Sequence, residues 1–221
     1  KSNIDGFYNI LILSKDFNVK HFVFASTSSV YGDTKKFPID ENQRINKPES
    51  FYAATKVCNE VMAYSFSKIY NMKCSSIRFF TVFGSMGRPD MALFKFFKNI
   101  LNNKIIYLFN NGKHVRDFTY IENIKETLIK IINDKNKKEN FNVYNLGSGQ
   151  PKTLKLFIDT ISDILEKKPI YRKLPLQKGD VIKTHADVNK IKKKYNYKLK
   201  ISFENGIREF IKWYKSYYVK K

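Results

Sequence analysis

Two short stretches restrict most what this chain can fold into: a strand that ends in hydroxyl side chains, and a helix start that carries a tyrosine and a lysine. The β-forming residues 21–25 run into hydroxyl groups at positions 27–29. Ligands bind at the carboxyl ends of strands in open α/β sheets, which is where such groups are delivered. The second stretch begins a helix and places Tyr52 and Lys56 four residues apart on one face. We therefore predict an α/β fold with a site at the end of this strand.

A lysine ammonium beside a phenol has a chemical use. A phenol has an ordinary pKa near 10, and an adjacent cation lowers it by stabilising phenolate. A shift of roughly 3 units corresponds to about 4 kcal/mol. Tyr52 would then take a proton from a sugar hydroxyl, while Thr27 would share that proton and hold the substrate oxygen. The spacing alone is common on helices, so a surface lysine beside a half-buried tyrosine is the competing interpretation.

Composition limits the class of protein. The 221 residues suffice for one large or two small domains, and 43% hydrophobic residues exclude a disordered composition. The net charge of +21 favours a polyanion partner, but the lysines are scattered and no nucleic-acid-binding signature accompanies them. A phosphate-bearing small substrate and general compositional bias explain the charge as well, so nucleic acid is an unlikely partner.

The cysteines and the hydropathy pattern indicate the cellular location of the protein and whether it binds a metal. Cys58 and Cys74 do not form a spaced metal set, and without a secretory signal they indicate reduced thiols in a cytoplasmic protein. We predict that Cys58 packs in the core, on an apolar stripe of the Tyr52 helix that also contains Val61, Met62, Ser65, Phe66 and Ile69. No apolar run approaches the roughly 18 residues of a membrane span.

Hydrophobic periodicity and turn residues predict an alternation of helices and strands. Helices are expected at 7–17, 52–70, 91–101, 121–132, 153–166, 187–195 and, capped by Ser202, 203–218; strands are expected at 20–25, 74–80, 105–109, 115–120, 141–146 and 170–174. Asn110 to Lys113 is a turn composition, so the strands on its two sides are expected to be joined by a tight connection. The triplet at 147–149 lacks the third glycine of a dinucleotide fingerprint and indicates a strand-to-loop turn.

Six motifs in register resemble the extended short-chain dehydrogenase/reductase family, and within it the NAD-dependent UDP-glucuronate 4-epimerases. They are Ala25-Ser-Thr-Ser-Ser-Val-Tyr-Gly32, Tyr52-Ala-Ala-Thr-Lys56, Arg78-Phe-Phe-Thr-Val-Phe-Gly84, Gly87-Arg-Pro-Asp-Met-Ala92, Arg116-Asp-Phe-Thr-Tyr120 and Gly179-Asp-Val181. The resemblance implies a Rossmann-like parallel sheet, incomplete at its amino-terminal end, with a smaller α+β substrate-binding domain. Residues 1–84 and 119–146 would belong to the NAD-binding domain, and residues 85–118 and 147–221 to the nucleotide-sugar domain.

The same resemblance implies roles for individual residues. Thr27, Tyr52 and Lys56 would be catalytic, and Ser26, Tyr52, Lys56 and Phe79 would contact NAD. The UDP-sugar would be bound by Thr27, Ser28, Thr81, Arg88, Arg116 and Asp180. An arginine suits a diphosphate because its planar fork donates two hydrogen bonds at once, although a surface ion pair is the alternative for each arginine.

The resemblance also narrows the reaction. The dehydratase and decarboxylase branches of the family carry a carboxylate after the strand, where this chain has Ser28 and Ser29, so no acid is available for elimination. Phe-Thr at Thr81 resembles the glucuronate epimerases, whereas glucose/galactose epimerases resemble Phe-Asn. We expect NAD-dependent epimerisation at carbon 4 of a UDP-hexuronic acid, through a 4-keto sugar, by a possible homodimer. The alternatives are another nucleotide-sugar enzyme of this family, such as a UDP-glucose 4-epimerase, and an inactive basic fragment with a binding role.

Two departures from the family pattern carry expectations of their own. Ser85 and Met86 stand where the family commonly has Pro-Trp, which affects the packing of the substrate loop. The glycine-rich turn that cradles the cofactor diphosphate, with its strand and helix, is not found in these residues. By comparison with the family, roughly ninety residues would precede Lys1. We expect the 221 residues alone to be inactive, to bind NAD poorly and to expose a sheet edge.

Overall fold

The computed structural model describes residues 1–136, 139–177 and 181–219. Its central feature is a parallel sheet of β1 (Phe22–Thr27), β2 (Cys74–Phe79) and β7 (Phe141–Leu146), in the order β1-β2-β7. The register sets Ser26 opposite Arg78, and Arg78 opposite Asn145. Because successive side chains alternate between faces, these three residues form a polar row across one face of the sheet, near the carboxyl ends of the strands.

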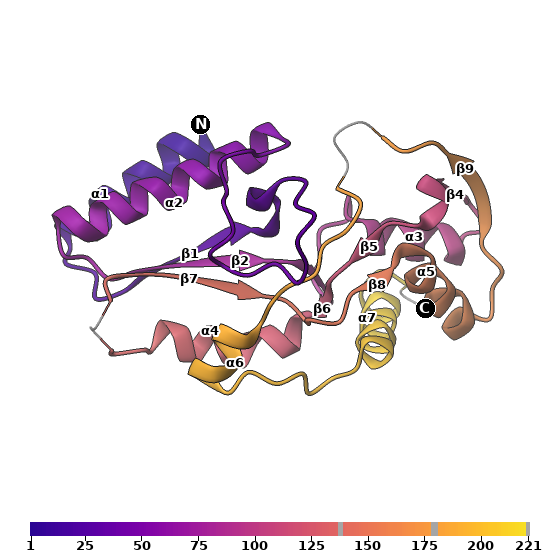
Figure 1. Cartoon of the computed structure of the whole chain (residues 1–221). Helices are drawn as coiled ribbons and strands as arrows, with labels where there is room; N and C mark the ends of the chain where they lie inside the picture. The colour runs from indigo at the N-terminus through magenta and orange to yellow at the C-terminus, as the bar shows by residue number, and fades with distance from the viewer. Residues whose placement is uncertain (137–138, 178–180, 220–221) are drawn as a thin grey trace.

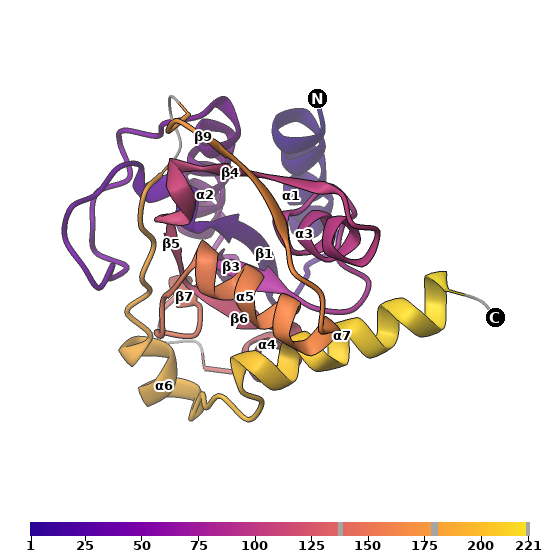
Figure 2. The ribbon, with the colours of Figure 1, turned by 90° about the vertical axis from the view of Figure 1, so that its right-hand side faces the viewer.

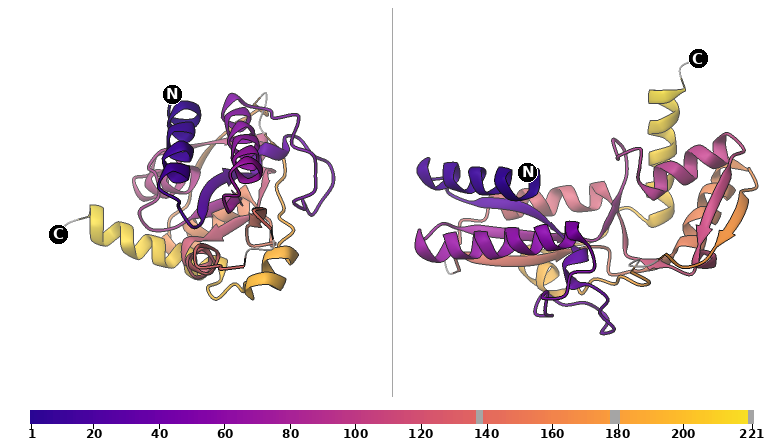
Figure 3. Two further views of the ribbon diagram at one scale, coloured as in Figure 1. Left: turned by 90° about the vertical axis from the view of Figure 1, so that its left-hand side faces the viewer. Right: turned by 90° about the horizontal axis from the view of Figure 1, so that it is seen from above.

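Helices cover both faces of this sheet (Figure 1). α1 (Phe7–Asp16) and α2 (Phe51–Ile69) lie side by side over the face that carries the polar row (Figure 3), and Leu11 and Ala63 are buried there. α4 (Ile121–Ile132) and α6 (Asn189–Tyr195) cover the opposite face. The layered α/β arrangement and the predicted parallel sheet are therefore confirmed.

A second hydrophobic core lies beyond the carboxyl ends of the strands (Figures 1 and 2). It contains α3 (Ala92–Leu101), α5 (Leu154–Leu165), α7 (Phe203–Tyr218) and the parallel pair β4 (Ile105–Phe109) and β9 (Ile170–Leu174). Phe97, Phe157 and Phe210 are completely or almost completely buried in it. Ser202 caps α7 as expected, because its side chain accepts a hydrogen bond from the backbone of Asn205.

Two short strand pairs connect the sheet with the second core. β3 (Thr81–Phe83) pairs in parallel with β6 (Phe118–Tyr120), and β5 (Val115–Arg116) pairs antiparallel with β8 (Lys152–Thr153). Short 3-10 turns follow β1 (η2, Ser28–Tyr31) and β4 (η3, Asn110–Gly112), and η1 (Ser2–Gly6) is a π-helical turn before α1. The strands on the two sides of η3 are joined tightly, as expected, but they pair with β9 and β8 rather than with each other.

The predicted buried stripe of α2 is wrong in part. Met62 and Phe66 are partly buried and pack against the cluster that contains Leu11, but Cys58, Val61 and Ile69 are exposed, the last two at 60% and 67%. The face toward the sheet consists of small and polar residues: Ala53, Thr55, Asn59, Glu60, Ala63 and Ser67. Small side chains let the helix approach the sheet closely, and hydrogen bonds satisfy most of the polar ones, with Asn59 Oδ1 as an exception among the described residues. The search for apolar spacing therefore included residues of the outer face.

The segment before α6, which was expected in the nucleotide-sugar domain, packs against the parallel sheet. Ala186, Val188 and Ile191 lie in one buried cluster with Tyr144 and Leu146 of β7. The chain thus returns to the parallel sheet after β9 and then crosses to α7, as Figure 1 shows. The domain boundaries remain a prediction. No helix in the described ranges combines the length and the apolar character needed to cross a bilayer.

Candidate active site

The predicted catalytic residues come from two elements that pack against each other, the carboxyl end of β1 and the start of α2. Thr27 is the last residue of β1, and its Oγ1 accepts a hydrogen bond of 3.2 Å from the backbone N of Ser29, which caps η2. The amino-terminal part of α2 packs against β1 and η2. Tyr52 is the second residue of α2 and is 49% exposed. Its ring therefore remains accessible at the helix start.

Lys56 is the cation of this site. Its Nζ donates a 3.0 Å hydrogen bond to the carbonyl oxygen of Ala25, two residues before Thr27. Partial burial lowers the pKa of Lys56 from its ordinary value. No described carboxylate lies within ion-pair distance of this ammonium. Lys56 thus has hydrogen-bonding capacity left for a polar group at the strand end.

Ser26 and Phe79, expected near the cofactor, lie at the ends of β1 and β2. Ser26 is 3% exposed, and its Oγ donates a 2.6 Å hydrogen bond to Glu60 on α2. The hydroxyl is therefore directed into the interface between sheet and helix. Phe79 is partly buried against the cluster that contains Ile124 and Leu146. Phe79 thus places an apolar side chain at the carboxyl end of β2.

The residues expected to bind the sugar nucleotide come from several elements. Ser28 begins η2, and Thr81, at the start of β3, is partly exposed. Arg88 forms a bidentate ion pair with Asp90, at 3.0 and 2.5 Å, so the predicted alternative of a surface ion pair is what the structure contains. The hydrogen bond with Asp90 raises the pKa of Arg88, and the charge interaction with Tyr52 raises it by a smaller amount. Both effects favour the charged form of Arg88.

Arg116 and Asp180 complete the predicted set. Arg116 Nη1 donates hydrogen bonds of 3.1 Å to the carbonyl oxygens of Val115 and Ile182, so the side chain holds the segment that follows β9. Asp180 lies outside the described residues.

Asp117, which the sequence analysis did not single out although it lies in a quoted motif, is the centre of this region. It is fully buried, and its carboxylate accepts hydrogen bonds from Ser148 N (2.6 Å), Ser148 Oγ (2.7 Å), Gly149 N (3.0 Å) and Ala186 N (2.9 Å). A Cβ at Gly147 would come within 3.1 Å of the same carboxylate and 2.9 Å of Ala186. Gly149 has a φ of +68°. The glycines thus permit a strand-to-loop turn, as predicted, around a buried carboxylate.

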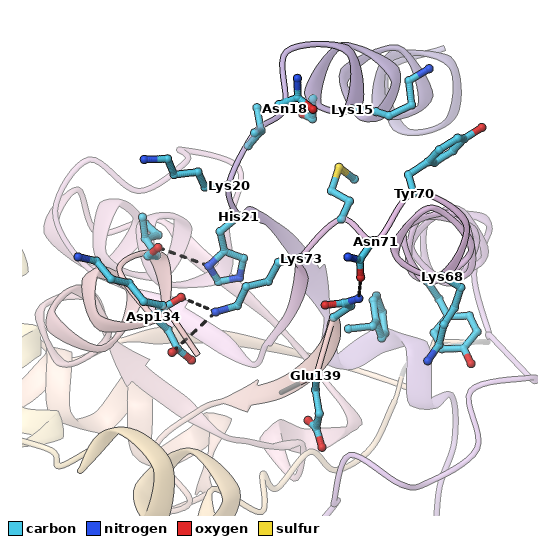
Figure 4. Close-up of a pocket in the computed structure, with 18 of the residues that line it drawn as sticks. Lys15, Asn18, Lys20, His21, Lys68, Tyr70, Asn71, Lys73, Asp134 and Glu139 are labelled. Carbon is cyan, nitrogen blue, oxygen red and sulfur yellow. Dashed lines mark hydrogen bonds and ion pairs between the residues drawn. The ribbon is translucent and has the colours of Figure 1, made fainter. Parts of the chain in front are cut away.

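A cavity of about 1390 Å³ lies at the opposite, amino-terminal edge of the sheet (Figure 4). His21 and Lys73, directly before β1 and β2, line it together with Asp134, which follows α4. Lys73 Nζ donates to the carbonyl of Asp134 and lies 3.7 Å from its carboxylate, and Tyr195 donates to the same carboxylate. Since these charges are compensated internally, we assign this cavity no part in the chemistry of Tyr52.

The sequence of this chain resembles those of several known proteins. Residues 1–147 match the model of the NAD dependent epimerase/dehydratase family. The chain is 43% identical over 214 residues to an uncharacterised Methanocaldococcus jannaschii protein, covering 97% of this chain and 65% of that protein. It is 39% identical over 215 residues to the UDP-glucuronate 4-epimerase of Thermodesulfobacterium geofontis, again covering 97% and 65%. The chain thus spans about two thirds of the length of these relatives.

A solved structure is similar as well. The chain superposes with a TM-score of 0.91 and 27% identity on the UDP-glucuronic acid 4-epimerase of Bacillus cereus in complex with UDP-glucuronic acid and NAD. The superposition covers 98% of this chain and 68% of that one.

Proposed function

Since the chain belongs to the NAD-dependent epimerase/dehydratase family, we propose that it carries the catalytic residues of a nucleotide-sugar 4-epimerase that interconverts UDP-glucuronate and UDP-galacturonate. The observation that carries this proposal is the position of Lys56, held at the end of β1 one helical turn after Tyr52. A cation fixed beside an accessible phenol is what a tyrosine base at neutral pH requires.

In the proposed mechanism this chain moves one proton. Tyr52, as phenolate, accepts the proton of the sugar's 4-hydroxyl, and Thr27 holds the same oxygen by a hydrogen bond. Lys56 stabilises the phenolate charge. After the hexose turns over, Tyr52 returns the proton to the oxygen at carbon 4, so no net proton is consumed.

NAD is the cofactor that we propose for this site. When bound, it supplies a hydride acceptor and donor for carbon 4 of the sugar. The half-buried ammonium of Lys56 fits the hydroxyl groups of a ribose, since its remaining donors have no described carboxylate partner. Tyr52 and Lys56 would hold that ribose, and Phe79 would pack near it. The Oγ of Ser26 already donates to Glu60, so Ser26 would contact the cofactor through other atoms.

For the substrate, we propose contacts with Ser28, Thr81, Arg88, Arg116 and Asp180. The guanidinium groups of Arg88 and Arg116 suit a diphosphate, which would compete with Asp90 for Arg88. Ser28 and Ser29 supply no carboxylate next to Thr27. This composition favours epimerisation, which needs one acid/base group, over dehydration, which needs another.

The remaining parts of the proposal concern the assembly. We propose a homodimer in the cytoplasm that does not use nucleic acid as a partner. The alternative role as an inactive basic fragment predicts retention on DNA that survives moderate salt, whereas purely electrostatic retention is lost as counterions compete.

The test is turnover of UDP-glucuronate by the full-length protein, with the product sugar identified by NMR. Tyr52→Phe and Lys56→Met should each lose most of the turnover. Tyr64→Phe is the matched control, since Tyr64 lies on the same helix, is 50% exposed and has its ring, which the change keeps, against Phe141 and Lys68. If no galacturonate signal appears, the proposed substrate is wrong. If UDP-glucose is the better substrate, the result supports the alternative of a UDP-glucose 4-epimerase. An active Tyr52→Phe protein contradicts the proposed base.

A further inference from the structure

A buried ion pair that the proposed mechanism does not use lies beneath the Tyr52–Lys56 pair. Glu60 of α2 and Arg78 of β2 are each 4% exposed. Arg78 Nε donates to Glu60 Oε1 at 2.9 Å, and Arg78 Nη2 donates to Glu60 Oε2 at 2.7 Å. This is the bidentate geometry that fixes both orientation and distance.

Further hydrogen bonds leave neither partner unsatisfied. Glu60 Oε1 also accepts from Ser26 Oγ (2.6 Å) and Ser76 Oγ (3.0 Å). Arg78 Nη1 donates to the hydroxyl of Tyr31 (2.8 Å) and to the carbonyl of Glu41 (3.1 Å). Burial is the largest single effect and opposes the charge of Arg78, but the hydrogen bonds and charge interactions with Glu60 and Tyr31 together outweigh it and raise the pKa of the guanidinium. Arg78 therefore keeps its charge in this buried position.

The network extends across the whole sheet at the level of the polar row. The hydroxyl of Tyr31 donates to Asn145 Oδ1 at 2.6 Å, and Asn145 Nδ2 donates to the carbonyl of Ile39 at 2.8 Å. One set of side chains thus joins α2, all three parallel strands, η2 and the loop that follows it. Every link is directional.

The position of Glu60 relative to the catalytic pair gives the network a further role. Lys56 is bonded to the carbonyl of Ala25, and Glu60, one turn later, is bonded to Ser26. Two successive turns of α2 are therefore fixed to two successive residues of β1. The apolar contacts of α2 come from Ala53 and Ala63 and from the partly buried Met62 and Phe66, and such packing is not directional.

We propose that Glu60, held by Arg78, is a positioning residue that sets the register of α2 on the sheet and thereby aligns Tyr52 and Lys56 with Thr27. The proposal rests on the proposed function. A misplacement of about 1 Å can cost about 10²-fold in rate. Replacing a buried ion pair by apolar residues of similar volume is often neutral for stability, so alignment and stability can be separated experimentally.

Two variants of the full-length protein provide the test: Glu60→Gln, and the double variant Glu60→Leu/Arg78→Met. In Glu60→Gln one amide N–H group faces the donors of Arg78, whereas the double variant removes both charges and leaves an apolar interface. Glu126→Gln is the control, because Glu126 lies on the exposed face of α4, where it pairs with Lys130 and Lys200. Melting temperature, kcat and KM for UDP-glucuronate are measured well below the lowest melting temperature.

We expect Glu60→Gln and the double variant to lower kcat by about tenfold to hundredfold while KM changes less than about threefold. The control should change neither constant. A folded Glu60→Gln or double variant with kcat within about threefold of the wild type overturns the proposal. If the double variant does not fold, Glu60→Gln decides.

A second measurement does not depend on turnover. The acetylation rate of each lysine with limiting acetic anhydride is followed by peptide mass spectrometry. Glu60→Gln should raise the rate at Lys56 at least threefold, since the register shift releases its bond to Ala25, while Lys68 on the same helix stays unchanged. An unchanged rate at Lys56 in the folded variant also overturns the proposal. A wild-type protein that does not convert UDP-glucuronate refutes the proposed function but leaves this measurement decisive for Glu60.

Discussion

Replacement of Asp117 by asparagine is a sharp test of the reasoning about buried carboxylates in this structure. The change keeps the shape of the side chain and removes its charge. Asp117 Oδ2 accepts from two backbone N–H groups, those of Gly149 and Ala186, and Oδ1 accepts from the backbone N and the hydroxyl of Ser148. The asparagine NH₂ group must therefore face at least one backbone N–H group.

The expected loss of stability follows from the less costly of the two orientations that the asparagine amide can take. With its NH₂ group toward Ser148, asparagine loses one backbone hydrogen bond, and the Ser148 hydroxyl can turn to accept from it. Hydrogen bonds to charged groups contribute about 1.5–3 kcal/mol, and a buried unsatisfied N–H costs about 1–3 kcal/mol. The sum of the lost bond and the unsatisfied group is a decrease of about 2.5–6 kcal/mol in the free energy of unfolding.

Urea unfolding of the full-length protein, followed by circular dichroism, measures this decrease. Asp40→Asn is the matched control, because Asp40 makes a single hydrogen bond to the backbone N of Asn42 at the surface, and we expect it to change stability by less than about 1 kcal/mol. A decrease below about 1 kcal/mol for Asp117→Asn refutes the assignment of Asp117 as a four-bond acceptor.

Three further predictions test other parts of the molecule. In the monomeric Val61→Glu variant of the next prediction, the exposed Cys58 should react with a thiol reagent at neutral pH, whereas Cys74, whose thiol pKa is raised to about 12 by burial, should react only after denaturation; two thiols titrating before denaturation would contradict this burial. The proposed homodimer should use the exposed α2 stripe of Cys58, Val61 and Ile69, because a two-fold interface buries the same patch on both copies and contiguous apolar patches mark interfaces. Val61→Glu should therefore halve the mass measured by light scattering, and an unchanged dimer mass would exclude this stripe. The 221 residues by themselves should bind NAD more weakly than micromolar in calorimetric titration and should aggregate, since β1 pairs only with β2 within the described part of the chain; micromolar or tighter binding would contradict this.

The elements that sequence reasoning predicted well are those whose signal is local. Hydrophobic spacing and asparagine stops predicted α1 and α2 to within about two residues, and Ser202 indicated the start of α7. The pairing of strands is not local: β4 and β9 are separated in the sequence by β5 to β8, and no turn between them indicates their contact. The tight connection at Asn110 to Gly112 is real, but tertiary contacts decide which strands pair.

The residues of the candidate site also fall into those that the sequence indicated and those that it did not. Thr27, Tyr52 and Lys56 were found from residue type and spacing, because their chemistry is visible in the sequence. Glu60 and Asp117 were missed, although both lie within a few residues of the motifs. Their function as acceptors depends on Ser26, Arg78, Ser148 and Ala186, which come from other elements.

The exposed stripe of α2 and its polar inner face have one physical explanation. A helix that must hold a phenol and an ammonium in fixed positions gains little from apolar contacts with the sheet, since these permit sliding and rotation at small cost. Hydrogen bonds from Ser26 and Arg78 to Glu60 are directional, and small residues such as Ala53 and Ala63 let the backbone come close enough to form them. Burying polar groups is tolerated there because each carboxylate oxygen of Glu60 has a donor. The inner face is therefore polar where it must be exact in register, while Met62 and Phe66 pack beside it and Val61 and Ile69 are left on the outer face.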